Sequence, residues 1–185
     1  MRDNEPASVR NLDGYGAAPI EWGRVRELFE TEITQAPDTG GPARHTSWLT
    51  TINPDGSPHV MPLGLRTVDG TWYFSSRPGT SKSRNIGRDP RCVVSIATHP
   101  FDLVVEGTAE RVVDDATLQA VAEAFAAQGW QASVAGDALT AEFSAPSAGP
   151  PPWYVYRVVP STVFALGTAE PYGATRFDLE PTPGR

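Results

Sequence analysis

Two tight turns separate three runs of strand-forming residues in the first half of the chain. The first turn is Pro54-Asp55-Gly56-Ser57, in which proline presets φ and glycine accepts a positive φ. The second is Asp69-Gly70, a dipeptide typical of two-residue β-hairpins. The strands expected around them cover residues 45–53, 58–68 and 71–74. Three antiparallel strands in sequence order are therefore the first constraint on the fold.

The rest of the chain adds more strands and few helices. Four further strands are expected, at residues 91–98, 102–113, 153–159 and 162–166. A helix is expected from Glu21, because the apolar residues that follow recur at three- and four-residue spacings: Val25, Leu28, Phe29 and Ile33. A second helix begins after Asp114 or Asp115 and stops at Gly129. This pattern predicts a mainly β fold, a closed or nearly closed antiparallel barrel with two to three helices.

Composition narrows the class of protein. The 185 residues suit one domain, and no run of about 18 apolar residues or signal-peptide core is present, so we expect a cytoplasmic protein without membrane contact. A net charge of −7 with scattered arginines disfavours nucleic acid as a partner. The single cysteine, Cys92, lies in an apolar run and is expected to be buried. His45, His59 and His99 have no metal-site spacing, so no metal is expected.

Three segments organise the chain. Residues 1–42 are expected to form a surface arm, a helix and a linker, and residues 43–167 the barrel domain. Residues 168–185 are a polar tail. Residues 130–152 are loop-like and end in the proline-rich segment 145–152.

The loop that follows the third strand is the strongest candidate for a ligand site. It contains Lys82, the only lysine in the chain, and the next basic residue is Arg84. Hydroxyl groups and a glycine precede them, at Ser75, Ser76, Gly79, Thr80 and Ser81. Hydroxyl donors, positive charge and a helix start suit a phosphate. A solvated loop with Thr80 or Ser81 as N-cap remains the alternative.

Pro62 points to a second part of the site. A proline within the second strand donates no ladder hydrogen bond, so Met61-Pro62-Leu63-Gly64 is expected at an edge or bulge. Backbone of that kind is free to contact a planar ligand. An edge-strand proline that blocks aggregation is the alternative. Because no nucleophile, acid–base pair or nucleotide loop is visible, any chemistry belongs to a bound cofactor.

These pieces, in this order, resemble the pyridoxamine 5′-phosphate oxidase-like superfamily of flavin and deazaflavin oxidoreductases. The resemblance covers residues 45–113 and continues loosely at residues 156–160. It rests on the turn at residues 53–58, the strand at 60–63, the Lys82-x-x-Asn85 loop, Arg88-Asp89-Pro90-Arg91 and the segment 102–107. The resemblance implies a six- to seven-stranded antiparallel Greek-key split β-barrel.

The resemblance also implies a homodimer with two cofactor sites at its interface, holding FMN or, alternatively, coenzyme F420. The ring is expected along Met61, Pro62, Leu63 and Gly64. The phosphate and the rest of the cofactor are expected near Arg66, Ser75, Ser76, Thr80, Ser81, Lys82, Arg84 and Asn85. Trp153 is expected either to pack on the partner's ring or to be buried. A tail of F420 would follow a basic groove formed by Arg77, Arg84, Arg88 and Arg91.

Departures from the family pattern limit the activity. The oxidases carry Ser-Arg-Lys where this chain has Thr80-Ser81-Lys82, and an arginine where it has Val104. A C-terminal Arg-x-His is also missing, so oxidation of pyridoxamine phosphate is not expected. The Lys-x-x-Asn form is similar to an actinobacterial branch that includes deazaflavin users. We expect hydride transfer between the cofactor and a small organic substrate; a carrier or storage protein and a haem-binding protein are the alternatives.

Overall fold

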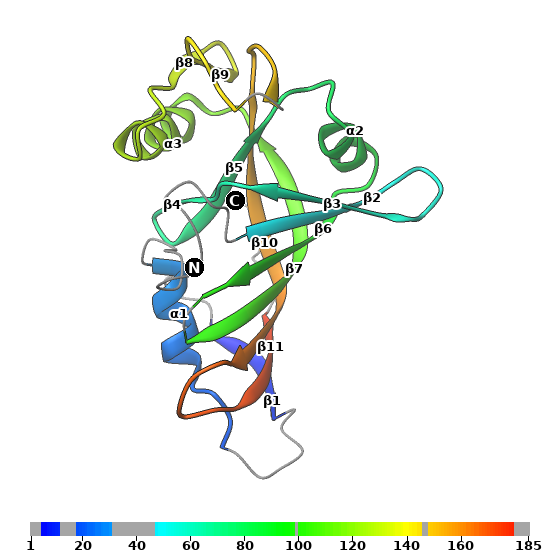
Figure 1. Ribbon diagram of the computed structural model, residues 1–185, viewed down its shortest axis with the longest axis vertical. Coiled ribbons are helices and arrows are strands. Elements are labelled where there is room, and N and C mark those ends of the chain that lie inside the picture. The colour runs from blue at the N-terminus through cyan, green and yellow to red at the C-terminus, as the bar shows by residue number, and fades with distance from the viewer. Residues whose placement is uncertain (1–4, 12–17, 31–46, 99, 146–147, 180–185) are drawn as a thin grey trace.

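The computed structural model describes residues 5–11, 18–30, 47–98, 100–145 and 148–179. Within these ranges the chain forms a nine-stranded antiparallel sheet, a two-stranded hairpin and three helices (Figure 1). None of the described helices is long and apolar enough to cross a membrane. The mainly β class expected from the turns and strand runs is confirmed.

Seven strands build the barrel. They are β2 (Ser47–Ile52), β3 (Pro58–Leu63), β4 (Arg66–Val68), β5 (Thr71–Ser76), β6 (Arg91–Ala97), β7 (Phe101–Val112) and β10 (Tyr154–Gly167). The pairing runs β3-β2-β6-β7-β10-β5-β4. The strand expected over residues 58–68 is therefore two strands, which bend apart at Gly64 and Leu65. Because β3 pairs with β2 and β4 with β5, this bent segment closes the barrel.

The turn chemistry explains the register. Asp69 and Gly70 both have positive φ, at 48° and 69°, as a two-residue hairpin with the right-handed strand twist requires. Gly56 has a φ of 84° in the turn between β2 and β3. Both turns lie where the sequence predicts them.

The long strand β10 serves two ladders. Its first residues, from Tyr154, pair with β5, and residues from Thr162 onward pair with β11 (Ala174–Leu179). The register against β7 shifts between Pro160 and Thr162. The prediction of two strands separated by Pro160 is thus wrong, because a bulge accommodates the proline within one strand.

Two strands lie in segments that were expected to be an arm and a tail. Strand β11 is in the tail, and β1 (Pro6–Asn11) pairs with it as the outermost strand. The side chains of Thr175, Phe177 and Leu179 are buried and alternate with partly exposed ones. Strand β1 is exposed along most of its length, so it forms because β11 offers an unpaired edge rather than through its own pattern.

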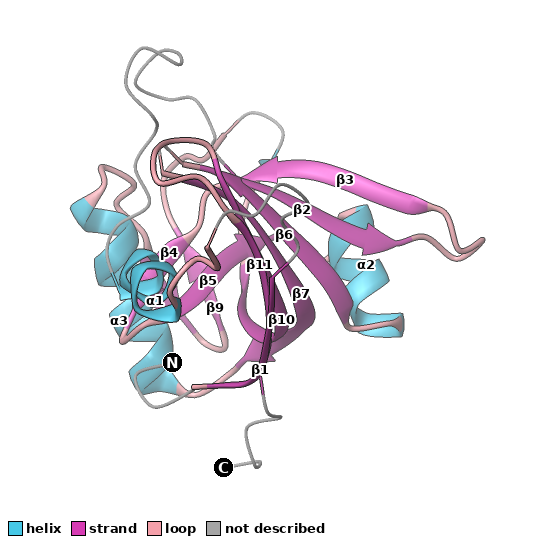
Figure 2. Cartoon of the chain, turned by 90° about the horizontal axis from the view of Figure 1, so that it is seen from below, coloured by secondary structure: helices cyan, strands magenta, loops and turns pink. Residues whose placement is uncertain are grey.

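The helices lie on two sides of the molecule. Figures 1 and 2 show α1 (Trp22–Glu30) and α3 (Asp115–Ala127) on one side and α2 (Ser81–Arg88) on the other. Thr80 caps α2 and Asp114 caps α3, each accepting a backbone N–H in its first turn. Ile33 and the linker at residues 35–42 lie outside the described residues.

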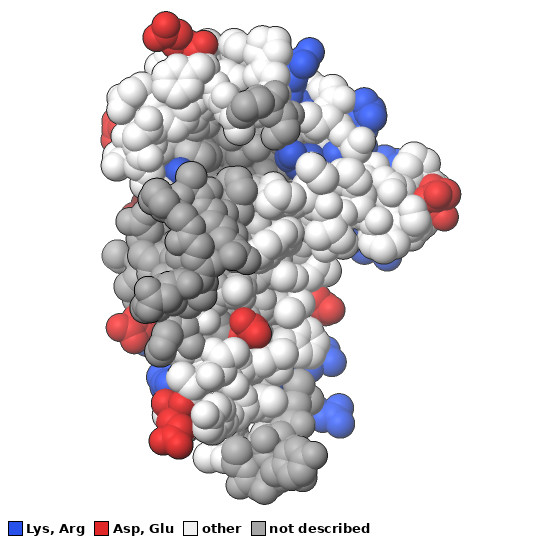
Figure 3. Space-filling model, in the orientation of Figure 1, with Lys and Arg blue, Asp and Glu red and all other residues white. Residues whose placement is uncertain are grey.

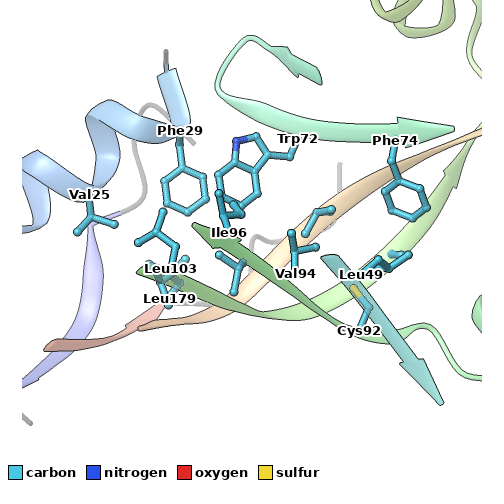
Figure 4. Close-up of a cluster of buried hydrophobic side chains, with 14 of the residues drawn as sticks. Val25, Phe29, Leu49, Trp72, Phe74, Cys92, Val94, Ile96, Leu103 and Leu179 are labelled. Atoms are coloured by element: carbon cyan, nitrogen blue, oxygen red, sulfur yellow. The ribbon is translucent and has the colours of Figure 1, made fainter. Parts of the chain in front are cut away.

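Apolar side chains fill the barrel and extend beneath α1. Strand β2 alternates buried and partly exposed residues, as a strand with one face on a core does. Figure 4 shows Val25 and Phe29 of α1 pointing toward Trp72, Ile96 and Leu103. Phe29 stacks on Trp72 with 4.2 Å between ring centroids.

A second, smaller cluster packs under α3. It joins Leu118, Val121 and Phe125 to Leu139 and Val155. Leu139 belongs to a hairpin formed by β8 (Ser133–Ala135) and β9 (Ala138–Thr140), and it bridges to Trp153. Part of the segment expected to be loop-like, residues 130–152, is therefore regular structure that covers the barrel beside α3.

Candidate functional site

Asn85 fixes helix α2 against the barrel. Its side-chain amide donates hydrogen bonds of 3.1 Å to the Thr51 hydroxyl and to the Asn53 side-chain oxygen. Asn85 and Thr51 are both buried, so the bond between them forms away from water, whereas Asn53 is partly exposed. Because both amide hydrogens are used inside the chain, the structure gives Asn85 the role of holding α2 on β2.

The inner face of β3 lies open beside this helix. Directly opposed residues of antiparallel strands share a face, so Met61 lies with Leu49 and His59 with Thr51. Leu49 is 1% exposed, whereas Met61 is 36% exposed. The inward-facing part of β3 is therefore not covered by the protein itself. On α2, Lys82 precedes the buried Asn85 by three residues and the buried Ile86 by four. This spacing places Lys82 on the same face of the helix as those two residues.

Lys82 is a partly buried cation with no counterion among the described residues. Its amine has neither a hydrogen bond nor an ion pair there. Burial lowers its pKa below the ordinary value, which means that the charged form loses solvation without gaining a partner. A cation in this state is able to bind an anion.

The hydroxyl groups before α2 divide between two faces of β5. Ser76 is buried on the face it shares with Phe74, and its hydroxyl lies 2.8 Å from that of Thr80. Ser75 is on the opposite face, opposite Val155 and toward the α3 cluster. Strand alternation thus separates two serines that the sequence analysis placed together. Thr80 uses its hydroxyl to cap α2, accepting from the Ser83 N–H at 3.3 Å.

The cluster of hydroxyl side chains beside α2 also includes Ser83 and Tyr156. Neither residue was predicted from the sequence. Thr80 lies 3.2 Å from the buried Ser83 hydroxyl. Burial raises the pKa of Tyr156, and its hydrogen bond with Ser83 opposes that shift. Tyr156 joins this region because β10 pairs with β5, placing it opposite Phe74. No local motif signals a contact between positions so distant in sequence.

The predicted arginines lie in different surroundings. Arg84 donates to the Gly79 carbonyl at 2.6 Å, and Arg88 donates to the Ile52 carbonyl, so both brace the loop and helix. Arg91 forms an ion pair with Asp89. Arg66 lies with its guanidinium 4.7 Å above the Phe125 ring of α3, rather than toward α2. Ser81 is partly exposed in the first turn of α2.

Three further predictions concern isolated residues. Trp153 is 1% exposed and packs edge-to-face on Trp130, so its ring has no free face for a cofactor. Cys92 is buried as expected, and burial raises its pKa to about 12, which makes it unreactive. His45 and His99 lie outside the described residues. No cluster of three metal-ligating side chains occurs in the described ranges.

A sequence model of one protein family matches most of the chain. Its description is pyridoxamine 5′-phosphate oxidase, and it matches residues 33–167. This range includes all of β3, the loop around Lys82 and all of β10. No protein in a curated set matches the sequence.

Solved structures share the fold at low sequence identity. A haem-binding protein from Mycobacterium smegmatis is 17% identical with a TM-score of 0.51, covering 71% of this chain and 53% of its own. A NimC/NimA family protein from Clostridium acetobutylicum is 13% identical with a TM-score of 0.51, covering 71% and 82%. A pyridoxamine 5′-phosphate oxidase-related, FMN-binding protein from Nostoc punctiforme is 18% identical with a TM-score of 0.47, covering 70% and 77%.

Proposed function

This chain belongs to the pyridoxamine 5′-phosphate oxidase family, and from that premise we propose that it binds a flavin between β3 and α2. The observation that carries this proposal is Lys82, a partly buried cation that has no partner among the described residues. A flavin phosphate supplies the anion that the lysine lacks. Met61, which is 36% exposed on the inner face of β3, offers the ring an apolar side chain to pack against.

The protein's own residues bind and orient the cofactor. Lys82 holds the phosphate, with hydroxyl groups of the loop before α2 close to it. Met61 and the backbone around Pro62 offer the ring an apolar surface at a strand that has no partner on its second edge in the described sheet. Asn85 keeps Lys82 in place by tying α2 to β2. The flavin, once bound, supplies the capacity to accept or donate hydride.

We propose FMN as the cofactor and a small organic molecule as its redox partner. Coenzyme F420 is the alternative cofactor. Binding of flavin without turnover across a panel of acceptors would identify a carrier rather than an oxidoreductase. Titration of the protein with FMN and with F420, followed by quenching of ligand fluorescence, separates the two cofactors.

The test of the site is the variant Lys82→Ala. We expect FMN affinity to fall by about tenfold or more, because a charge-assisted contact to phosphate is lost. Arg10→Ala is the matched control, since Arg10 is an exposed cation on β1. It removes the same charge and should leave affinity unchanged. Equal affinity of wild type and Lys82→Ala would contradict the proposal.

Haem is a second candidate ligand because of His59. It is the one histidine in the described part of the chain, and it lies on the inner face of β3 beside Met61. Histidine and methionine are both axial ligands of haem iron. Haem titration of wild type and His59→Ala tests this: a Soret band shared by both variants excludes ligation by His59.

We also propose that the protein is a homodimer that completes the site. Met61 is 36% exposed on the inner face of β3, where the flavin is proposed to lie, and a second copy of the chain would cover it together with the ring. Sedimentation velocity with and without FMN tests the assembly. A monomer that binds FMN with full affinity would contradict it.

A further inference from the structure

The parts of the chain outside the family match form one end of the molecule. The match covers residues 33–167, so α1, β1 and β11 lie outside it. Figure 1 shows these three elements toward the end of the molecule opposite to α2. Figure 3 shows both acidic and basic side chains on that end, whereas Lys and Arg side chains gather over α2. A site at this end is therefore separate from the one proposed beside Lys82.

A short segment before α1 forms the first wall of a cleft at this end. It covers residues 18–20, and the Ile20 N–H donates a hydrogen bond of 2.7 Å to the buried Thr175 hydroxyl of β11. Backbone packing holds the segment as well, because a Cβ added at Gly173 would lie 2.8 Å from the Ala18 carbonyl oxygen. Glycine allows this close approach, so the segment is fixed on the start of β11.

The loop between β10 and β11 forms the second wall. Residues 168–172 make up this loop, and the Gly167 N–H donates to the Gly173 carbonyl at 2.7 Å, which closes the loop at its base. The Thr168 N–H also donates to the Pro100 carbonyl at 3.2 Å, just before β7. Both walls are thus fixed by backbone contacts, and the space between them is preformed.

The space between the two walls is a cleft of about 710 Å³, which we call the terminal cleft. Sites for small molecules in proteins have volumes in this range. The apolar lining comes from both walls and consists of Pro19, Ile20, Pro171 and Tyr172. Ile20 is 3% exposed and Tyr172 is 59% exposed, so the lining runs from a buried floor to an open aromatic side chain. Such a surface suits a ligand with an apolar group.

One cation and one anion also line the terminal cleft. Arg24 belongs to the first turn of α1, beside the first wall, and Glu170 belongs to the second wall. Glu170 forms no hydrogen bond or ion pair with any residue in the described ranges, so the two side chains do not neutralise each other. A ligand that carries one negative and one positive group can contact both, through charge-assisted hydrogen bonds.

We propose that the terminal cleft binds a free α-amino acid with an apolar side chain. The carboxylate and the ammonium of such a ligand are attached to one carbon, so they reach charged groups on both walls. The guanidinium of Arg24 binds the carboxylate, and the carboxylate of Glu170 binds the ammonium. The apolar side chain packs on the prolines and on the ring of Tyr172. This inference goes beyond the proposed function, because the cleft shares no residue with β3 or α2.

The experiment titrates the full chain by calorimetry with three probes built on one aromatic ring. L-Phenylalanine carries both charges, 3-phenylpropionate lacks the ammonium, and 2-phenylethylamine lacks the carboxylate. We expect L-phenylalanine to bind about tenfold more tightly than either of the others, since each of them lacks one charge-assisted contact. L-Leucine and L-methionine extend the panel to other apolar side chains.

Variants of the cleft assign the contacts. Glu170→Gln should weaken L-phenylalanine binding by about tenfold and leave 3-phenylpropionate binding unchanged. Arg24→Gln should weaken the binding of both and leave 2-phenylethylamine binding unchanged. Tyr172→Ala should weaken the binding of all three probes, because the apolar wall is lost. Glu142→Gln and Arg10→Gln, at exposed positions outside the cleft, are the matched controls.

Saturable binding of L-phenylalanine that only the cleft variants weaken supports the proposal. Absence of saturable binding for all three amino acids overturns it, and so does binding that Glu170→Gln and Tyr172→Ala both leave unchanged. Equal affinity for L-phenylalanine and 3-phenylpropionate overturns the role of Glu170. FMN affinity should be the same in Glu170→Gln as in wild type, and a protein that binds L-phenylalanine but not FMN contradicts the flavin site alone.

Discussion

The two helices α1 and α2 attach to the same barrel by different physical means. Helix α1 is held by apolar contacts: Phe29 stacks on Trp72, and Trp22 lies 4.9 Å from Phe177 between ring centroids. Helix α2 buries one apolar side chain, Ile86, and adds polar contacts of Asn85 and Arg88 to β2. It leaves Lys82 without a partner in the described chain. Apolar contacts maximise stability but tolerate small shifts. Hydrogen bonds fix one orientation, which a binding site requires.

The largest effect should come from the α1 side. Phe29→Ala removes a ring that is 1% exposed, and we expect a loss of about 3–5 kcal/mol in the free energy of unfolding. Urea denaturation measures it. Val9→Ala, an exposed position on β1, is the control and should change stability little. A loss near that of the control would mean that α1 does not hold the barrel together.

A smaller effect is expected on the α2 side from Asn85→Ala. The variant removes two hydrogen bonds and leaves the Thr51 and Asn53 acceptors unpaired, which costs about 1–3 kcal/mol. FMN affinity should also fall, because Lys82 is no longer held in place. Gln119→Ala removes an exposed amide bonded to Glu123 and serves as control. If Asn85→Ala lowers stability but leaves FMN affinity unchanged, the hydrogen bonds of α2 do not orient Lys82 for binding. The two helices would then both serve stability alone.

Lys82→Met should make the ligand-free protein more stable at neutral pH. Burial lowers the pKa of Lys82 in the folded state, so the unfolded chain binds the proton more tightly. Burying the charged amine of Lys82 therefore lowers the free energy of unfolding of the wild type. This cost is fully present below the folded-state pKa and is relieved as pH rises toward the ordinary pKa near 10.5. The stability difference between variant and wild type should therefore shrink between neutral pH and pH 10. A constant difference in urea denaturation would contradict this.

The smallest effect concerns the exposed end of α2. The guanidinium of Arg91 lowers the pKa of Asp89 to about 2, by a hydrogen-bonded ion pair. In Arg91→Ala this pKa should return toward 3.8, as an NMR titration of the Asp89 carboxyl would show. The ion pair contributes to the free energy of unfolding above the ordinary pKa of Asp89. This contribution is lost as pH falls through about 2. Any stability difference between the two proteins should vanish at that acidic limit.

Sequence reasoning succeeded where a residue acts through its neighbours in the chain. Asp69-Gly70 specifies its hairpin by backbone conformation alone, and Asp114 caps α3 through a hydrogen bond three residues away. The Lys82 loop could be singled out for the same reason, since its residues are consecutive, and its role in binding stays a prediction. Pairing between distant strands was harder to predict. The alternation of Thr175, Phe177 and Leu179 is a period-two signal that could have revealed β11, whereas the exposed β1 has no such signal.

In the candidate site, too, contacts between neighbours in the chain were easier to predict than contacts between distant residues. The sequence treats Ser75 and Ser76 alike, but strand alternation directs one toward α3 and the other toward Thr80. The role of Asn85 depends on Thr51, 34 positions away, and so required the folded structure.

Strand β10 belongs to two ladders at its two ends, one with β5 and one with β11. Its residues from Thr162 to Leu166 have β11 on one edge and β7 on the other, while Tyr154 to Arg157 lie between β5 and β7. Transient separation of β1 and β11 therefore exposes only the later amides of β10 to exchange with deuterium. The earlier amides exchange only when the barrel itself opens. Hydrogen exchange along β10 therefore reports separately on the β11 ladder and on the ladder that leads into the Lys82 loop.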